Sequence, residues 1–102
     1  MITLCIHYEI DQNKLRDFEA YAKSLPEPIH RCGGDLVGYF LPTKIAGATN
    51  RALALINFPD LTAYQHYREA LAKDTQFIAS VKCMEDSHCV LCEDRSILQR
   101  VT

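Results

Sequence analysis

The chain has 102 residues, of which 48% are hydrophobic and 24% are charged, a balance typical of one globular domain and not of a disordered segment. The formal net charge is −2 and no run of Lys or Arg occurs, which argues against nucleic-acid binding. The longest apolar runs, such as residues 52–56, are too short to span a bilayer.

Residues 2–9 alternate between two faces, which predicts a strand with Ile6 on one face and His7 on the other. Asp11 then suits the cap of a helix. Apolar residues recur at helical spacing from Leu15 to Leu25, and the prolines at 26 and 28 predict the end of this helix or a break before one more turn at 29–32. Gly33 and Gly34 predict the turn that follows.

Residues 36–41 predict a second strand, with Leu36 and Phe40 on the face opposite Val37, Tyr39 and Leu41. Residues 42–50 predict a long hairpin loop, and residues 51–58 a third strand. On this third strand Leu53 and Leu55 face away from the set Ala52, Ala54, Ile56 and Phe58.

Asp60 and Asp74 are expected to cap two consecutive helices, the second of them short. Residues 87–95 alternate again and predict the fourth strand. The element order is therefore β-α-β-β-α-α-β, which is the ferredoxin-like order with its second helix split in two. It predicts a single α+β domain over residues 1–102, in which helices cover one face of a four-stranded antiparallel sheet.

Three segments resemble the NIPSNAP family: FPDLTAYQHYR at 58–68 after the apolar strand, Gly33-Gly34 followed by GYFLP at 38–42, and the first helix with KL at 14–15 and FEAY at 18–21. The resemblance implies a dimeric α/β barrel, in which two ferredoxin-like subunits place their sheets together. The wider superfamily includes cofactor-independent monooxygenases, heme enzymes and proteins of no known activity. The NIPSNAP branch supplies no catalytic motif to carry over.

The inner strands predict a homodimer independently of that resemblance, because both of their alternating faces are apolar. An antiparallel sheet with one face in water should carry polar residues on that face. A second copy related by a two-fold axis would cover the face that the helices leave bare.

Cysteine chemistry is expected to be simple. The count of five is odd, and Met1–Leu4 begins a strand pattern where a signal peptide would need a basic and then an apolar stretch, so we expect reduced thiols in a cytoplasmic protein. Cys89 and Cys92 have the spacing of half a zinc site, but strand residues three apart point to opposite faces. The sequence predicts neither a metal nor a cofactor.

The candidate ligand-binding residues are His7, Tyr39 and Arg51. His7 can titrate near neutral pH, Tyr39 would add to an apolar wall, and Arg51 could hold an anionic group at the rim. A structural histidine with a cross-strand partner such as His88 is the alternative for His7. Cys5 lies on the same face as His7, but their Cβ atoms should be about 7 Å apart, twice the rise per strand residue, so no hydrogen-bonded pair is expected.

Two functions remain open at this point. The first is a NIPSNAP-like module of undefined biochemical activity that binds a small apolar or aromatic molecule or a partner. The alternative is a cofactor-independent monooxygenase-like enzyme acting on such a molecule. An apolar cavity that holds a polar residue such as His7 would favour the second function, and a filled core the first.

Overall fold

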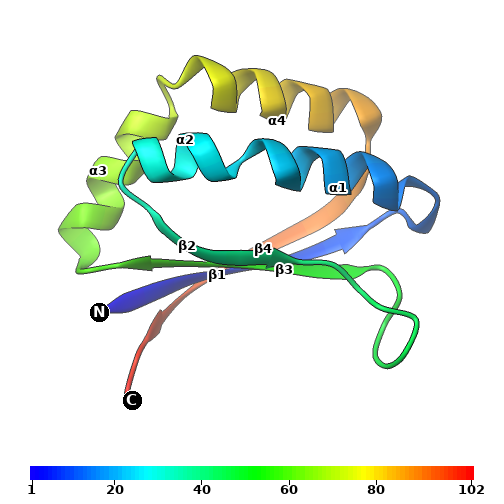
Figure 1. Cartoon of the computed structure of the whole chain (residues 1–102), viewed down its shortest axis with the longest axis horizontal. Coiled ribbons are helices and arrows are strands. Elements are labelled where there is room, and N and C mark those ends of the chain that lie inside the picture. Colours follow the sequence, from blue (N-terminus) through cyan, green and yellow to red (C-terminus); the bar gives the residue numbers. More distant parts are fainter.

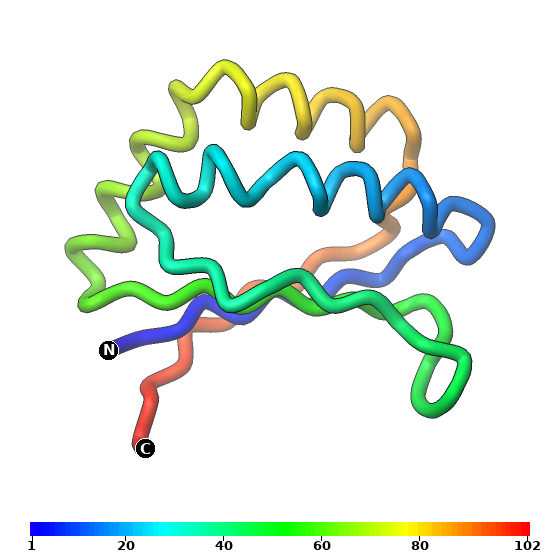
Figure 2. The backbone as a smooth tube through the Cα atoms, in the orientation of Figure 1, coloured from blue at the N-terminus to red at the C-terminus, as the bar shows by residue number.

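The computed structural model describes all 102 residues and has the predicted ferredoxin-like fold. Four antiparallel strands form one sheet in the order β2-β3-β1-β4, and the helices cover one face of it (Figure 1). The tube in Figure 2 shows residues 41–50 leaving the body as a loop between β2 and β3. In chain order the elements are β1 (Ile2–Ile10), a 3-10 turn η1 (Gln12–Lys14), α1 (Leu15–Ser24), α2 (Pro26–Arg31), β2 (Asp35–Phe40), β3 (Arg51–Phe58), α3 (Leu61–Leu71), α4 (Thr75–Ser87) and β4 (Val90–Gln99).

The three predicted caps are confirmed. The backbone N–H of Ala63 donates to Asp60 at 2.8 Å, which starts α3, and that of Phe77 donates to Asp74 at 2.9 Å, which starts α4. Asp11 accepts from the N–H of Asn13 at 3.0 Å and starts η1. Each carboxylate satisfies one of the N–H groups that a helix leaves without a partner in its first turn.

The predicted boundaries were wrong around α4 and β4. Helix α4 has 13 residues and is not short, and His88 ends it in the left-handed conformation at φ 57°. Apart from glycine, histidine is one of the few residue types that adopt this conformation more often than most. Strand β4 consequently starts at Val90 and extends to Gln99, beyond the range 87–95. The predicted break of the first helix is confirmed, since α1 ends at Ser24. The helix that follows begins at Pro26 and not at residue 29, because proline is favoured in the first turn of a helix.

A bulge in β2 overturns the predicted faces of that strand. Leu36 pairs with Ile56 and Tyr39 with Ala54, whereas Gly38 pairs with Leu55 after a shift in register. The extra residue moves Leu36 to the same side of the sheet as Tyr39. The prediction that these two residues lie on opposite faces was therefore wrong. An isolated glycine within a strand is the sequence signal of such a bulge.

The helix-facing side of the sheet forms the core. Fifteen buried residues make one cluster there, among them Leu4, Ile6, Phe18, Ile56 and Phe58. Ala52 and Ala54 belong to this cluster, opposite Leu53 and Leu55, so the predicted faces of β3 are confirmed. No helix of the chain has the length and apolar character required to cross a membrane.

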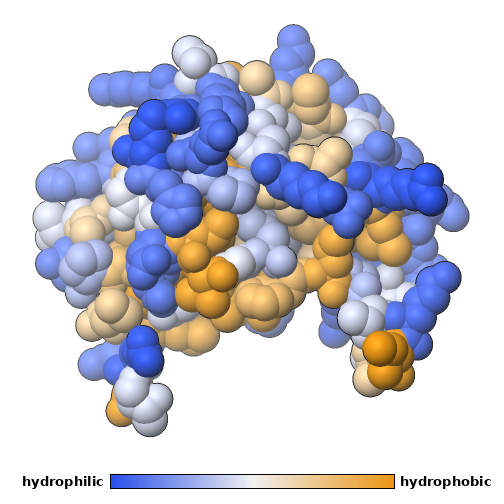
Figure 3. All heavy atoms as spheres, viewed as in Figure 1, coloured by the Kyte–Doolittle hydropathy of each residue, from blue (hydrophilic) through white to orange (hydrophobic).

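The opposite side of the sheet, here called the outer face, carries no helix. Val37 is 53% exposed, Phe40 47% and Leu98 50%, and Leu53 and Leu55 beside them are half-buried. Figure 3 shows apolar side chains gathered along the lower part of the molecule, where the sheet lies, and hydrophilic ones over the helical layer. A single subunit therefore leaves an apolar surface uncovered.

Candidate functional site

A small cavity lies between the sheet and the helices. Its volume is about 30 Å³, close to the space that one water molecule takes in the liquid. An open cleft of about 250 Å³ lies against it, and the two share Tyr21, Arg68, Leu71, Phe77 and Arg95. The polar side chains of the inner cavity are four tyrosines and two arginines: Tyr8, Tyr21, Tyr39, Tyr67, Arg68 and Arg95. The rest of its wall is apolar and consists of Leu4, Ile6, Ile29, Ile56, Leu71 and Phe77.

Two aromatic clusters hold the tyrosines in place. In the first, the ring of Tyr8 from β1 meets the ring of Phe18 from α1 edge-on at 4.9 Å, and Tyr21 lies 5.9 Å from Phe18. The hydroxyls of Tyr8 and Tyr39 are 3.4 Å apart and share a hydrogen bond. In the second, Tyr67 of α3 packs on Phe58 of β3 at 4.8 Å. Tyrosines from elements far apart in the sequence therefore line the same cavity.

These phenols stay neutral well above physiological pH. Burial raises the pKa of Tyr39 to about 12. Burial, and then the neighbouring Tyr39, also raise the pKa of Tyr8, of Tyr21 and of Tyr67. A neutral phenol is a hydrogen-bond donor, so the cavity offers O–H groups and no phenolate.

Tyr67 is a buried donor in the wall of the cavity. It is 3% exposed, and its hydroxyl forms no hydrogen bond within the chain. Because no fully enclosed polar side-chain atom lacks a partner, this hydroxyl borders open space, and Tyr67 is among the residues that line the cavity. The hydroxyl of Tyr21, which also lines the cavity, has no hydrogen bond either, so the site has two unused phenol donors.

Arg95 supplies positive charge from β4. It lies on the helix side of the sheet, since it pairs with Ile6, and its side chain is 39% exposed. Its guanidinium contacts Glu93 at 2.9 Å. The carboxylate lines the cleft and not the inner cavity, where both charged residues are arginines. The wall of the inner cavity therefore includes two arginines, one of which is paired with a carboxylate.

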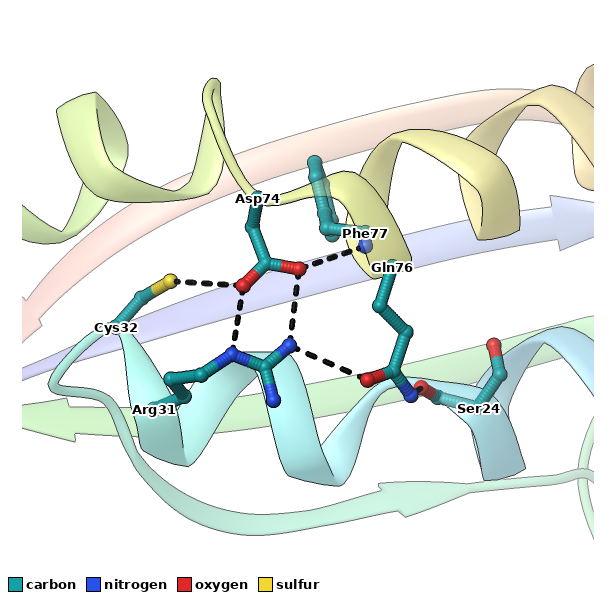
Figure 4. A network of polar contacts seen from close by, with 6 residues as sticks. All are labelled: Ser24, Arg31, Cys32, Asp74, Gln76 and Phe77. Carbon is teal, nitrogen blue, oxygen red and sulfur yellow. Dashed lines mark hydrogen bonds and ion pairs between the residues drawn. The ribbon is translucent and has the colours of Figure 1, made fainter.

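A polar network joins α4, which borders the cleft, to α2. Arg31 holds Asp74 through two parallel bonds, of 2.8 Å from Nε and 3.0 Å from Nη2, and reaches Gln76 at 3.2 Å (Figure 4). Cys32 contacts the same carboxylate at 3.8 Å. The Arg31 hydrogen bonds, together with that from the Phe77 N–H, lower the pKa of Asp74 to about 2. The network fixes the start of α4 beside the cavity.

The predicted candidates His7 and Arg51 come together, but Tyr39 is not with them. His7 and Arg51 line a hollow of about 290 Å³ on the outer face, beside Glu9, Cys92 and Asp94. Tyr39 lies across the sheet, in the tyrosine cavity. The bulge in β2 and the alternation of β1 place these side chains on opposite faces. Ligand contact by His7 or Arg51 stays a prediction that this arrangement does not test.

Two expectations about His7 were wrong. The Sγ of Cys5 lies 3.4 Å from Nε2 of His7, within contact distance, because the two side chains lean along the strand and close the gap between their Cβ atoms. His88 cannot be a cross-strand partner, since it lies at the end of α4; the partners of His7 in register are Leu53 and Asp94.

The five cysteines form no disulfide. Cys89 is buried in the core and Cys92 is exposed on the outer face, so the two side chains are separated as predicted. The reason differs from the predicted one, because Cys89 precedes β4 and a bulge between Val90 and Cys92 interrupts the alternation. No group of three or more His, Cys, Asp or Glu side chains is arranged to hold a metal ion.

Sequence reasoning missed most of the cavity. The sequence pattern places Tyr21 and Tyr67 at the borders of the apolar helix stripes and Arg95 at the end of the predicted strand 87–95, and none of these positions predicts a cavity. Arg95 instead lies within β4, because that strand continues to Gln99. The available signal was the alternation of Glu93, Arg95 and Ile97, which puts an arginine on the helix side once the register with β1 is known.

The fold defines a class, the ferredoxin-like α+β domains. A candidate antibiotic biosynthesis monooxygenase from Nitrosomonas europaea has this fold, with a TM-score of 0.75 over 100% of both chains and 9% identity. A NIPSNAP domain protein from Burkholderia xenovorans is similar over 100% of this chain and 96% of its own, with a TM-score of 0.83 and 18% identity. A NIPSNAP family protein with unknown function from Agrobacterium tumefaciens is similar over 98% of this chain and 87% of its own, with a TM-score of 0.83 and 18% identity.

The NIPSNAP family profile matches residues 4–102, so the chain belongs to the NIPSNAP family. This confirms the resemblance seen in the sequence. The comparison with curated proteins found no match. At these identities the solved structures establish the fold, and the biochemical activity stays undefined.

Proposed function

We propose that this NIPSNAP protein is a homodimeric module that binds a small, largely apolar or aromatic molecule in the tyrosine cavity. One observation carries the proposal: four neutral phenols and two arginines, which come from five elements, line a single opening in an otherwise apolar layer. Ligand sites are mostly apolar concavities with a few well-placed polar groups. The cavity and its cleft have this composition.

The homodimer is supported by the outer face. Val37, Phe40, Leu53, Leu55 and Leu98 form an apolar patch that a second copy would remove from water.

The odd number of cysteines and the lack of a disulfide fit a reducing compartment, and we propose a cytoplasmic location on that ground.

Binding is favoured over a monooxygenase-like reaction by the residues around the cavity. The fold similarity to a candidate antibiotic biosynthesis monooxygenase is the observation in favour of an enzyme. A general base near neutral pH is usually a histidine or a carboxylate. The inner cavity has neither, and in the adjoining cleft, which Glu85 and Glu93 line, Glu93 is paired with Arg95. His7, the histidine proposed from the sequence, lies on the other side of the sheet.

Native mass spectrometry of the protein purified from its own host tests this proposal. We expect the mass of two chains plus a small molecule, which denaturation releases. A Tyr67→Phe variant, which removes an unused donor from the cavity wall, should retain less of the molecule, while His7→Ala, on the outer face, should retain as much as the parent. A single chain, or a molecule lost only from His7→Ala, would contradict the proposal.

A further inference from the structure

We infer that the ligand of the tyrosine cavity is a small organic anion, a carboxylate or enolate joined to an aromatic or apolar body, with its anionic oxygen placed beside Tyr67 and Arg95. The inference rests on the proposed function and names the chemical class of the ligand.

The charge of the lining carries the first step. The charged side chains around the inner cavity are Arg68 and Arg95, and no carboxylate lines it. The remaining polar groups are neutral phenols, which donate hydrogen bonds to an acceptor. Donors and cations together favour a ligand oxygen that carries negative charge, and such charge-assisted hydrogen bonds are about twice as strong as neutral ones.

The unused hydroxyl of Tyr67 carries the second step. A side chain that is 3% exposed normally has its polar atom hydrogen-bonded within the protein, and this one has no partner in the chain. Tyr8 and Tyr39, by contrast, satisfy each other through their 3.4 Å contact. Tyr67 is therefore free to donate to a ligand without giving up a bond that stabilises the fold.

The dimensions carry the third step. The inner cavity, at about 30 Å³, is large enough for a small polar head and is far smaller than the cleft. The cleft, at about 250 Å³, is lined by Leu71, Phe77, Val81 and Met84 and suits the body of the ligand. The geometry thus orients the ligand with its charged end inward and its apolar end under α4.

Glu93 sets how strongly the anion binds. Its carboxylate holds Arg95 at 2.9 Å, so an incoming anion competes with it for the guanidinium. Removing the Glu93 charge should release Arg95 toward the cavity and raise the affinity for an anion several-fold.

Calorimetric titration with matched pairs tests the inference: benzoate against benzamide, and 1-naphthoate against 1-naphthamide. The members of each pair have nearly the same shape and differ in charge. We expect the carboxylates to bind the parent protein at least about tenfold more tightly, a difference of about 1.4 kcal/mol. Tyr67→Phe should weaken carboxylate binding and leave the melting temperature unchanged, since no hydrogen bond within the chain is lost.

Arginine variants locate the charge that matters. Arg95→Gln should remove the preference for the carboxylate, and Glu93→Gln should increase it. Arg51→Gln, in the outer hollow, is the matched control and should leave the preference intact. Equal binding of amide and carboxylate would overturn the anion inference and leave the proposed function standing. Failure of all four compounds to bind would count against the proposed function itself and so against the inference, and loss of the preference in Arg51→Gln would move the site to the outer face.

Discussion

Gly34 occupies a point with no room for a side chain, where the chain enters β2. A Cβ there would lie 2.8 Å from Cγ2 of Ile29 and 3.0 Å from Cε1 of Tyr67. We expect Gly34→Ala to lower the free energy of unfolding by about 1–3 kcal/mol, because a packed core resists added atoms. Gly38→Ala is the control: its Cβ would meet only the exposed ring of Phe40, at 3.2 Å, which can move. Urea unfolding measures both, and equal losses would contradict this packing.

The tyrosine pKa values make a second prediction at the residue scale. The pKa of Tyr39 is raised to about 12 by burial, so the Tyr39 phenol holds its proton more strongly in the folded protein than in the unfolded chain. The stabilisation from its neutral phenol is complete below the ordinary tyrosine pKa of about 10 and is lost as pH rises from there toward 12. Spectrophotometric titration should show phenolate absorbance appearing late and together with unfolding. Full ionisation of all five tyrosines near pH 10 in a still folded protein would contradict the buried cluster.

Some residues could be assigned from the sequence and others could not, for physical reasons. The face of His7 follows from strict alternation in β1, and the structure places it there. The position of Tyr39 relative to Leu36 depends on one extra residue in β2. The neighbouring residues are apolar, so the pattern does not show which side chains lie on which face. Arg95 and Tyr67 meet only through the register of β4 with β1 and the packing of α3, which are long-range properties.

At the scale of elements, Asp74 joins three helices. Its carboxylate caps α4, and Arg31, the last residue of α2, binds that carboxylate from the side (Figure 4). Asp74 itself directly follows the short turn after α3. The pKa of Asp74, lowered to about 2, makes the carboxylate form favour folding. This stabilisation is present above the ordinary Asp pKa of about 4 and is lost as pH falls from there toward 2.

Asp74→Asn isolates the ionic part, since asparagine also caps helices well. We expect a lower melting temperature than the parent above pH 5, with the two curves converging near pH 2. Asp60→Asn is the matched control, because Asp60 caps α3 without an ion pair. A difference between parent and Asp74→Asn that is the same at pH 2 and pH 7 would show that the network contributes no charge effect.

Element types were predictable because they depend on local pattern, and element ends were less so. The three aspartate caps and the whole of β3 follow from nearby residues. The end of α4 depends on His88 adopting a left-handed conformation, which glycine would have signalled and histidine does not. Strand β4 lies at an edge of the sheet, where exposure on both sides blurs the alternation that marks its limits.

At the scale of the molecule, the outer face makes the prediction of a dimer testable. Leu55→Glu puts a charge in the middle of the apolar patch, and we expect it to yield monomers in analytical ultracentrifugation at micromolar concentration, because an unpaired charge is costly to bury. Leu61→Glu, at an exposed leucine of α3, should remain dimeric. A parent protein that sediments as a monomer, or two variants that behave alike, would contradict an interface on the outer face.

A crystal structure of the protein with 1-naphthoate tests the position of the ligand most directly. We expect density for the ring in the cleft under α4 and for the carboxylate beside Tyr67 and Arg95, in each subunit of a two-fold dimer. Density only in the hollow formed by His7 and Arg51 would contradict a binding site between the sheet and the helices.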